Sequence, residues 1–498
     1  MSKGFSRRLF LGSVLAGLAD RAFANAPKAS LRPVPRPGTV AVAKPAVTGG
    51  EALVAGSRLT GRVAYAVADV KTGLMLETRE AATGQPPASV AKAVTALYAL
   101  EALGPQHRFA TRLVSSGVIS NGTLSGDLVL AGGGDPTLDT DALADMAKRL
   151  KAAGVNRVKG RFLVWEGALP FASEIDKGQP EHVSYNPAVS GIALNYNGVH
   201  FEWKRGAKGY GVTMQARTEK YRPSVDIARM QINKRRSPVY TYQSKDGRDL
   251  WTVASEALGK GGSRWLPVRN PGGYAGDVFR SMAKANGIEL PQAQVVSGAL
   301  NGRALVTHKS AELRIILRDM LRWSNNLTAE MVGMSASVAR GARVSGLKAS
   351  ADEMNRWAAS KLGMRDAQLV DHSGLGDASR VSAGDLAAAL VRVHGEGRLK
   401  PILKAISMRD SKGRPIKDHP VEVVAKTGTL NFVSALAGYM TAQDGTELAF
   451  VMFAADEKAR SGIRKEDREA PRGAKTWNRR AKVLQQQLIE RWGALYGS

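Results

Sequence analysis

The chain has 498 residues, of which 44% are hydrophobic and 23% are charged, a composition typical of a globular protein of several domains. It contains no cysteine, which excludes disulfide bonds and thiolate chemistry. The 71 Lys and Arg residues against 44 Asp and Glu residues give a formal net charge of +27. This charge favours an anionic partner, such as a nucleic acid or an anionic envelope polymer or surface, although a solvated basic surface without a specific partner has the same composition.

The N-terminus has the features of an export signal. Ser6-Arg7-Arg8-Leu9-Phe10-Leu11 is a twin-arginine motif, and the apolar run from Leu9 to Ala19 is too short to span a bilayer. Because Ala22-Phe23-Ala24 offers a cleavage site, residues 1–24 are predicted to be a signal peptide, and the protein is predicted to be periplasmic. Export argues against a nucleic-acid partner. The proline-rich residues 25–50 predict a flexible linker.

The globular part is predicted to begin near residue 51 with a hairpin and a helix. Apolar segments at 63–67 and 74–76 flank a turn at 69–73, a pattern typical of two paired strands. An apolar run over 89–103 predicts a helix, which Gly104 would end.

The predicted secondary structure changes in type twice along the rest of the chain. Residues 109–300 are rich in short apolar segments and glycine turns, whereas helical patterns return after residue 310. Strands are predicted at 111–114, 127–130, 162–165, 421–424, 435–441 and 448–455. Helices are predicted near 141–153, 276–286, 311–323, 351–362 and 475–492.

Three short motifs carry the predicted chemistry. Ser89-Val90-Ala91-Lys92 places a hydroxyl and an amine on one face of a first helical turn, and such an amine can activate a serine nucleophile without histidine. The free amides and the positive dipole of a helix N-terminus also stabilise an oxyanion. Ser324-Asn325-Asn326 and Lys426-Thr427-Gly428 follow in the chain, and the ordered trio is the signature of penicillin-recognising serine enzymes.

Copies of these motifs occur elsewhere, and their context separates them. Ser281 lies inside a predicted helix, where its amide is already hydrogen-bonded, and Ser345 precedes a glycine in a predicted loop. Lys71-Thr72-Gly73 falls in the predicted hairpin turn. Asp371-His372-Ser373 has the residue types of a catalytic triad, but three consecutive side chains cannot form that relay, so His372 is not predicted to be a base.

With these motifs, the chain resembles the type-4 penicillin-binding proteins, which are serine D-Ala-D-Ala carboxypeptidases and endopeptidases. The resemblance covers residues 52–455 and extends to three further stretches, Asn121-Gly122-Thr123-Leu124-Ser125-Gly126-Asp127-Leu128, Gly132-Gly133-Gly134-Asp135-Pro136-Thr137-Leu138 and Asp371-His372-Ser373-Gly374-Leu375. His372 stands where this family more often has glycine. The charged stretch 460–480 matches nothing in the resemblance and is expected to be a solvated insertion.

The resemblance implies a mixed α/β (α+β) fold. A penicillin-recognising, transpeptidase-like peptidase domain, an antiparallel sheet flanked by helices, is expected from residues 51–108 together with 301–498. Residues 109–300 are expected to form one or more inserted accessory domains. None of the three catalytic motifs falls in that insertion.

The resemblance also implies three catalytic roles. Ser89 is the expected nucleophile, Lys92 its general base, and Ser324 the group that relays the proton to the leaving amine. Two lysines that converge on one cleft lower each other's pKa, and burial adds to this effect. Lys92 can therefore be neutral near pH 7.

Substrate-binding roles are implied for five further residues. Asn326 is expected to hold a backbone amide of the substrate, and Lys426 with Thr427 to receive the terminal carboxylate. The amide of Thr429, with that of the nucleophile, is expected to complete the oxyanion hole. Gly428 would let the substrate backbone approach closely.

The predicted function is a serine D-Ala-D-Ala carboxypeptidase or endopeptidase that acts on peptidoglycan peptide stems through an acyl-enzyme and is inhibited by β-lactams. One alternative is a β-lactamase-like hydrolase, which would release its penicillin adduct quickly. Another is a non-catalytic basic protein that binds an anionic cell-wall polymer. No cofactor and no metal are predicted, because the sequence has neither a His-Glu-x-x-His motif nor a histidine cluster.

Overall fold

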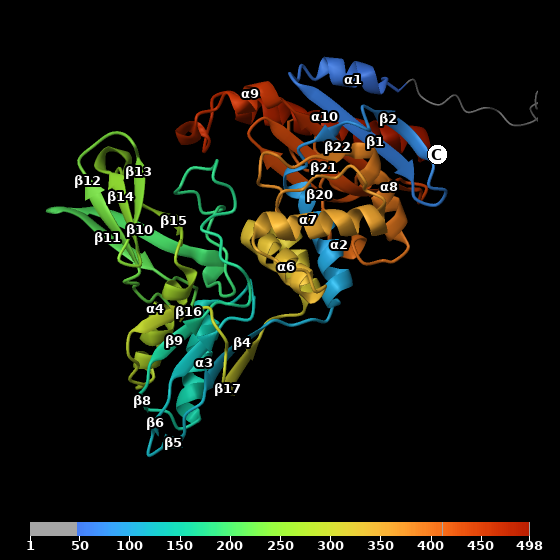
Figure 1. Cartoon of the computed structure of the whole chain (residues 1–498). Helices are drawn as coiled ribbons and strands as arrows, with labels where there is room; N and C mark the ends of the chain where they lie inside the picture. The colour runs from blue at the N-terminus through green and yellow to red at the C-terminus, as the bar shows by residue number, and fades with distance from the viewer. Residues whose placement is uncertain (1–46, 411, 498) are drawn as a thin grey trace, which may run out of the picture. The chain divides into compact units, whose positions relative to one another are not determined.

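A computed structural model describes residues 47–410 and 412–497 (Figure 1). The predicted signal peptide and most of the predicted linker lie outside the described residues. Contacts group residues 47–498 as one unit, so the division into a peptidase domain and inserted domains stays a prediction. Within the described part of the chain, no helix is both long and apolar enough to cross a membrane.

The largest sheet has six antiparallel strands in the order β19-β20-β21-β22-β1-β2. Strands from both ends of the described chain build it: β1 (Arg62–Asp69), β2 (Met75–Arg79), β19 (Lys404–Ala405), β20 (Glu422–Leu430), β21 (Val433–Thr441) and β22 (Glu447–Ala455). Pairing of β1 with β22 joins the two segments. The predicted hairpin at the start and the three predicted strands near the end are therefore neighbours in one sheet.

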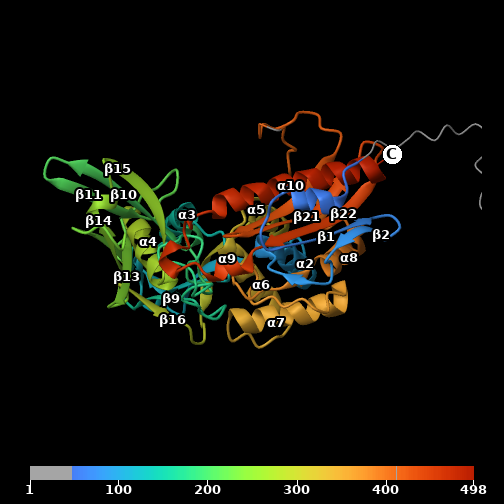
Figure 2. The same ribbon diagram turned by 90° about the horizontal axis from the view of Figure 1, so that it is seen from above.

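Alternating side chains give this sheet two buried faces. Ala64 and Ala66 of β1 pack into a core with helices on one side, whereas Val63, Tyr65 and Val67 pack into a second core with α10 (Ala474–Tyr496). Figure 2 shows α10 across one face of the sheet and the helices of the first core on the other. The helices of the first core are α2 (Ala91–Leu103), α5 (Leu313–Trp323), α7 (Leu347–Trp357) and α8 (Ala383–His394), with α6 (Asn326–Ala339) beside α2. This arrangement confirms the predicted mixed α/β fold with helices on an antiparallel sheet.

The residues between α2 and α5 have a separate apolar core. A five-stranded sheet in the order β16-β9-β7-β4-β17 packs with two helices, and three three-stranded sheets, β11-β10-β15, β12-β14-β13 and β5-β6-β8, complete this part. The short strands of the last sheet are β5 (Ile119–Ser120), β6 (Thr123–Leu124) and β8 (Arg157–Val158). Its main elements are β4 (Ala110–Ser115), β7 (Leu128–Ala131), α3 (Thr140–Ala152), β9 (Phe162–Trp165), β10 (Gly198–Gly206), β11 (Gly209–Gln215), β12 (Ala228–Asn233), β13 (Tyr240–Lys245), β14 (Arg248–Ala254), β15 (Gly261–Pro267), α4 (Pro271–Ala285), β16 (Ala293–Val296) and β17 (Arg303–Lys309).

Two predicted boundaries differ from the structure at places that matter for the site. The helix predicted over 89–103 is a 3₁₀ helix at Ala88–Val90 that leads into α2. The strand predicted at 421–424 ends before Lys426, whereas in the structure Lys426 lies in the middle of β20, because pairing with β21 continues to Leu430. Helix α8 and strands β10–β15 were not predicted.

Candidate active site

Ser89 and Lys92 meet at the start of α2. Ser89 lies in the 3₁₀ helix, and Lys92 follows in the first turn of α2, from where its Nζ donates to Ser89 Oγ at 2.9 Å. Two glycines let other segments press against this turn. A Cβ on Gly428 would lie 2.8 Å from the Pro87 carbonyl oxygen, and one on Gly374, whose φ is +73°, would lie 1.9 Å from the carbonyl oxygen of Ala88. Gly428 was expected to make room for substrate, and in the structure it makes room for the serine turn.

Lys92 is fully buried, and three acceptors surround its amine. Besides the Ser89 hydroxyl, Nζ donates to Asn326 Oδ1 at 2.7 Å and to the Ser373 carbonyl oxygen at 2.7 Å. Burial lowers the pKa of Lys92 to about 8, against the opposing effect of the buried carboxyl groups of Asp371 and Glu330. With a pKa near 8, about a tenth of the amine is neutral at pH 7, so this group can accept a proton.

The Ser-Asn-Asn motif occupies the turn between α5 and α6. Ser324 has a left-handed backbone conformation with a φ of 59°, and Asn325 caps α6 by accepting from the amide of Thr328. A non-glycine residue in this conformation costs about 1 kcal/mol, a strain often found at functional sites. This conformation directs the Ser324 hydroxyl toward β20, here called the catalytic strand because it carries Lys426. Lys426 Nζ donates to Ser324 Oγ at 2.9 Å.

Lys426 is the second buried lysine of the site. It is 1% exposed, and its Nζ also donates to the Thr427 carbonyl oxygen at 2.7 Å. Burial, then the positive charges of Lys92 and Lys404, hold the pKa of Lys426 well below its usual value. An incoming carboxylate would reverse this effect and favour the ammonium form, which suits a residue expected to receive a negatively charged group.

The catalytic strand leaves one edge free beside these lysines. Strand β19 pairs only with Val424 and Ala425 of β20, so Thr427 and Thr429 lie beyond its reach and are exposed. Within the described residues, no strand covers this edge. An extended peptide can therefore add along it, as peptides do at open sheet edges.

A cavity of about 340 Å³ lies where these segments meet. The predicted residues Ser89, Ser324, Asn326 and Thr429 line it, and the hydrogen bonds described above connect them to Lys92 and Lys426. The structure thus brings the three motifs together from distant parts of the chain. The copies at Ser281, Ser345 and Lys71 are not part of this cluster: Ser281 lies within α4, Ser345 just before α7, and Lys71 in the turn between β1 and β2.

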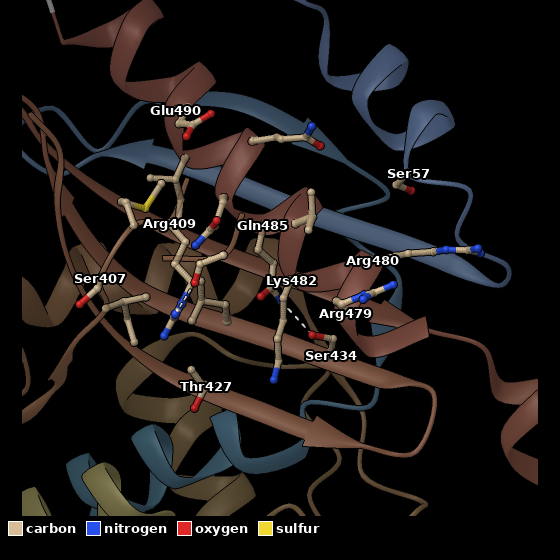
Figure 3. Close-up of a pocket in the computed structure, with 18 of the residues that line it drawn as sticks. Ser57, Ser407, Arg409, Thr427, Ser434, Arg479, Arg480, Lys482, Gln485 and Glu490 are labelled. Carbon is tan, nitrogen blue, oxygen red and sulfur yellow. Dashed lines mark hydrogen bonds between the residues drawn. The ribbon is translucent and has the colours of Figure 1, made fainter. Parts of the chain in front are cut away.

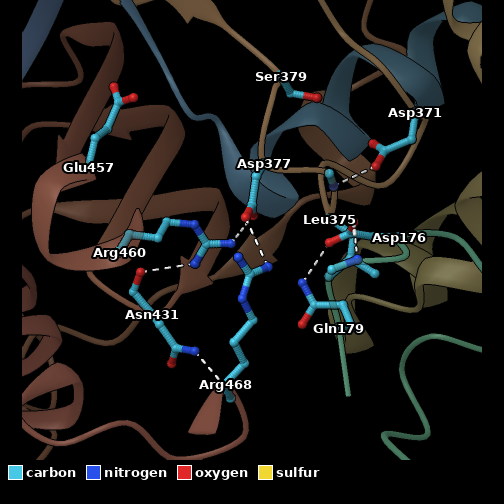
Figure 4. A network of polar contacts seen from close by, with 12 residues as sticks. Asp176, Gln179, Asp371, Leu375, Asp377, Ser379, Asn431, Glu457, Arg460 and Arg468 are labelled. Atoms are coloured by element: carbon cyan, nitrogen blue, oxygen red, sulfur yellow. Dashed lines mark hydrogen bonds and ion pairs between the residues drawn. The ribbon is translucent and has the colours of Figure 1, made fainter. Parts of the chain in front are cut away.

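The charged stretch expected to be a solvated insertion instead forms a wall of this cavity, which corrects that prediction. Arg460 and Arg468, in a C-terminal segment (residues 456–473), line the cavity, and both pair with Asp377, as Figure 4 shows. Arg460 is only 8% exposed and also donates to the Asn431 carbonyl oxygen at 3.0 Å. The sequence shows the charge of this segment but not the distant carboxylate that binds it.

The region between α2 and α5 also reaches the cavity, although none of the motifs predicted this. Asn326 Nδ2 donates to the Tyr185 carbonyl oxygen at 2.9 Å, and Tyr185 and Gln179 line the cavity. Glu469 of the C-terminal segment bonds His182 at 2.7 Å and Arg264 at 2.6 Å. These two contacts lower the pKa of Glu469 to about 2, so it stays ionised and joins the two segments.

A buried carboxyl group supports the site from beneath. Glu330 of α6 accepts hydrogen bonds from the amides of His372 at 3.0 Å and Ser373 at 2.9 Å, and so fixes the turn whose carbonyl binds Lys92. Burial and the neighbouring Asp371 raise the pKa of Glu330 to about 8. Glu330 is the one charged residue in the sequence of α6. A single charge in an otherwise uncharged helix is the sequence feature from which a buried supporting role could have been predicted.

His372 faces the core and not the cavity. Its ring is fully buried, with Nε2 at 2.7 Å from Ser350 Oγ and Nδ1 at 3.3 Å from Met354 Sδ. Burial lowers the pKa of His372 to about 3, so the ring is neutral. This placement agrees with the prediction that His372 is not a catalytic base.

The fold defines a class of protein. The crystal structure of penicillin binding protein 4 (dacB) from Haemophilus influenzae superposes with a TM-score of 0.71 at 20% sequence identity, covering 89% of this chain and 100% of that chain. This chain therefore has the fold of a penicillin-binding serine hydrolase.

The family model described as the D-Ala-D-Ala carboxypeptidase 3 (S13) family matches residues 51–471, and the chain belongs to this family. A D-alanyl-D-alanine carboxypeptidase of Actinomadura sp. (strain R39) is 28% identical over 452 residues, which are 80% of this chain and 79% of that protein. D-alanyl-D-alanine carboxypeptidase DacB of Haemophilus influenzae is 25% identical over 392 residues, which are 74% of this chain and 79% of that protein. The predicted family and the predicted enzyme class, a serine-type peptidase, are confirmed.

Proposed function

We propose that this protein is an exported peptidase that releases terminal D-Ala from peptidoglycan peptide stems, or cleaves D-Ala cross-links, through an acyl-enzyme on Ser89. One observation carries the proposal: a buried lysine with a lowered pKa lies 2.9 Å from the Ser89 hydroxyl, beside an open strand edge. The names of the relatives, D-alanyl-D-alanine carboxypeptidases, support the substrate class. The twin-arginine motif at Arg7-Arg8 supports export.

In the acylation step, Lys92 takes the proton of the Ser89 hydroxyl as Oγ attacks the carbonyl carbon of the penultimate D-Ala. The new oxyanion is stabilised by the amides of Ser89 and Thr429, an interaction worth about a hundred- to a thousandfold in rate in related reactions. The C–N bond then breaks, and the proton passes through Ser324 to the leaving amine. Water later hydrolyses the ester and restores the hydroxyl.

Substrate binding follows from the same geometry. The peptide lies along β20, with its terminal carboxylate at Lys426 and Thr427 and its acyl part toward Leu430 and the 340 Å³ cavity. Asn326 accepts from Lys92 through Oδ1 and donates to the Tyr185 carbonyl through Nδ2. We propose that Nδ2 exchanges the Tyr185 carbonyl for a backbone amide carbonyl of the substrate.

A β-lactam presents a strained amide and a carboxylate with the same spacing as the peptide, so we propose that it acylates the same hydroxyl. The Haemophilus influenzae protein has been crystallised in complex with a β-lactam, and that structure superposes with a TM-score of 0.68 at 20% identity, covering 88% of this chain and 99% of that one.

Digestion of purified muropeptides tests the proposal. The protein should release D-Ala from monomeric pentapeptides or split cross-linked dimers, and preincubation with penicillin should prevent both reactions. Ser89→Ala should be inactive, whereas Ser345→Ala, in a copy of the motif outside the site, should retain full activity. No release of D-Ala or of split dimers would contradict the proposal, and rapid turnover of penicillin would indicate a β-lactamase instead.

A further inference from the structure

A second, larger cavity, here called the basic groove, opens on the α10 side of the catalytic strand (Figure 3). Its volume is about 1440 Å³. Thr427, Gly428 and Thr429 of β20 form its floor together with β21, and α10 and the loop between β19 and β20 line its sides. In Figure 3 the side chain of Lys482 extends from α10 toward the strand that carries Thr427.

The groove is strongly positive. Seven cationic residues line it, all of them exposed: Arg58, Lys404, Arg409, Lys412, Arg479, Arg480 and Lys482. Among the described residues, none of the seven forms an ion pair with a carboxylate, although ion pairs are common elsewhere on this surface. Two acids line the groove, and one of them, Asp410, is already paired with Arg414. Clustered cations whose charge no carboxylate neutralises attract an anionic ligand.

The position of the groove along β20 sets which part of a substrate would reach it. The catalytic cavity borders Thr429, Leu430 and Asn431, whereas the basic groove borders Thr427 to Thr429. Under the proposed function, the acyl part lies toward Leu430 and the terminal carboxylate at Thr427. The groove therefore continues the site on the side of the leaving group. Lys404 of the groove is close enough to Lys426 to lower its pKa.

We propose that the basic groove binds the carboxylate-bearing peptide strand that leaves when a cross-linked substrate is cleaved. This inference rests on the proposed function. When terminal D-Ala is released, the leaving group is one amino acid and ends at Thr427. When a cross-link is cleaved, the leaving amine belongs to a second stem peptide, whose further carboxylates extend past Thr427 along the row of cations. The groove thus favours cleavage of cross-links over trimming of ends.

The chemical step is the same for both substrates. The bond from Ser89 Oγ to the carbonyl carbon forms, the amide C–N bond breaks, and the hydroxyl proton ends on the departing amine of the second strand. Water then hydrolyses the ester, which leaves a carboxylate on the acyl strand and restores the hydroxyl. Because the groove touches only the strand that departs, its effect is expected mainly on KM for cross-linked substrates.

A pair of matched variants tests the groove. Arg479→Gln with Lys482→Gln removes two groove charges, and Lys234→Gln with Arg236→Gln removes two exposed charges from the loop after β12, which lines neither cavity. The measurement is the ratio of kcat/KM for a cross-linked muropeptide dimer to that for a monomeric pentapeptide. Loss of two exposed charge contacts should lower this ratio about tenfold in the groove variant. The control should change it less than about twofold.

The groove can also be tested by removing the negative charges of the substrate. Amidation of the carboxylates on the leaving stem should lower the wild-type ratio at least as much as the groove variant does. It should lower the variant's ratio less than it lowers the wild-type ratio, because the two changes remove contacts that they share. Lys412→Gln, on the opposite wall, should give a smaller fall of about threefold. The rate of adduct formation with fluorescent penicillin checks that each variant is folded.

Several results would overturn the inference. Equal falls in the groove variant and the control would indicate general attraction by the net charge. An unchanged ratio with normal penicillin adducts would exclude the groove as a strand site, and loss of binding to a phosphate-rich envelope polymer in that case would assign it to such a polymer. Failure of the wild-type protein to form any penicillin adduct would overturn the proposed function itself, which is a separate readout.

Discussion

The two cavities that border Thr429 use lysine in opposite ways. In the smaller one, Lys92 and Lys426 are buried, each held within 2.9 Å of a serine hydroxyl, and burial lowers the pKa of both. In the larger one, Lys482 and its neighbouring cations are exposed. Burial thus lets Lys92 act as a base and leaves Lys426 to regain its charge when a carboxylate binds, whereas the exposed groove cations can bind charge directly.

The largest expected effect comes from removing the buried base. Lys92→Met should slow acylation by penicillin by roughly 10²–10⁴-fold, the usual contribution of a general base. The rate is measured as growth of the adduct mass. Lys348→Met, in the copy of the motif that lies before and within α7, should leave the rate unchanged. Equal rates for wild type and Lys92→Met would mean that the two cavities do not differ as described.

The buried carboxyl group beneath Lys92 should affect stability next. Glu330→Gln places an amide nitrogen against the backbone N–H of His372 or Ser373, because glutamine has one acceptor oxygen where glutamate has two. The free energy of unfolding should fall by about 1–3 kcal/mol, measured by urea denaturation. Glu289→Gln, which removes an exposed ion pair with Arg157, should cost less than about 1 kcal/mol.

The pH dependence of acylation distinguishes the two kinds of lysine. Because the neutral form of Lys92 is the base and its pKa is lowered to about 8, the acylation rate should rise about tenfold per pH unit below pH 8 and level off above it. The pKa of Lys92 is lower in the folded protein than in the unfolded chain, so the charged lysine destabilises the fold. This cost falls as the pH rises from the folded pKa of about 8 toward the pKa of the unfolded chain. The groove variant Arg479→Gln/Lys482→Gln should keep the same profile. A flat profile from pH 6 to 9 would contradict the assignment of the base.

A smaller effect is expected at the wall of the catalytic cavity. Asp377→Asn removes the shared partner of Arg460 and Arg468 and should loosen the C-terminal segment, at a cost of about 1–2 kcal/mol for the cations left in partly buried positions. Hydrogen exchange of residues 460–469 should speed up, and the matched surface change Asp366→Asn should not alter it. Unchanged exchange in Asp377→Asn would show that this pair does not hold the segment.

Features that depend on neighbouring residues could be predicted from the sequence, whereas features that depend on contacts between distant residues could not. The hairpin of β1 and β2, the strands β20 to β22 and helix α10 could be predicted from local apolar patterns and turn residues. The three motifs identified the site because each is short, and the order of Ser89, Ser324 and Lys426 matched a known family. These features need no knowledge of distant contacts.

The missed features all depend on pairing across the chain. From the sequence alone, Arg460 and Arg468 are expected to be exposed to solvent, because their partner Asp377 lies far away in the chain. Tyr185 contributes a backbone carbonyl, which no side-chain pattern encodes. The basic groove is likewise assembled from four separate segments, within 52–58, 404–413, 427–436 and 479–490. Only Glu330 left a local signal, as a lone charge in the sequence of α6.

Peptide mapping of the penicillin adduct identifies the nucleophile. After incubation of the wild-type protein with penicillin and digestion, we expect an added acyl mass on the peptide containing Ser89, and no adduct in Ser89→Ala. An adduct on another serine, or stable adduct formation by Ser89→Ala, would contradict the assignment of the nucleophile and the mechanism built on it.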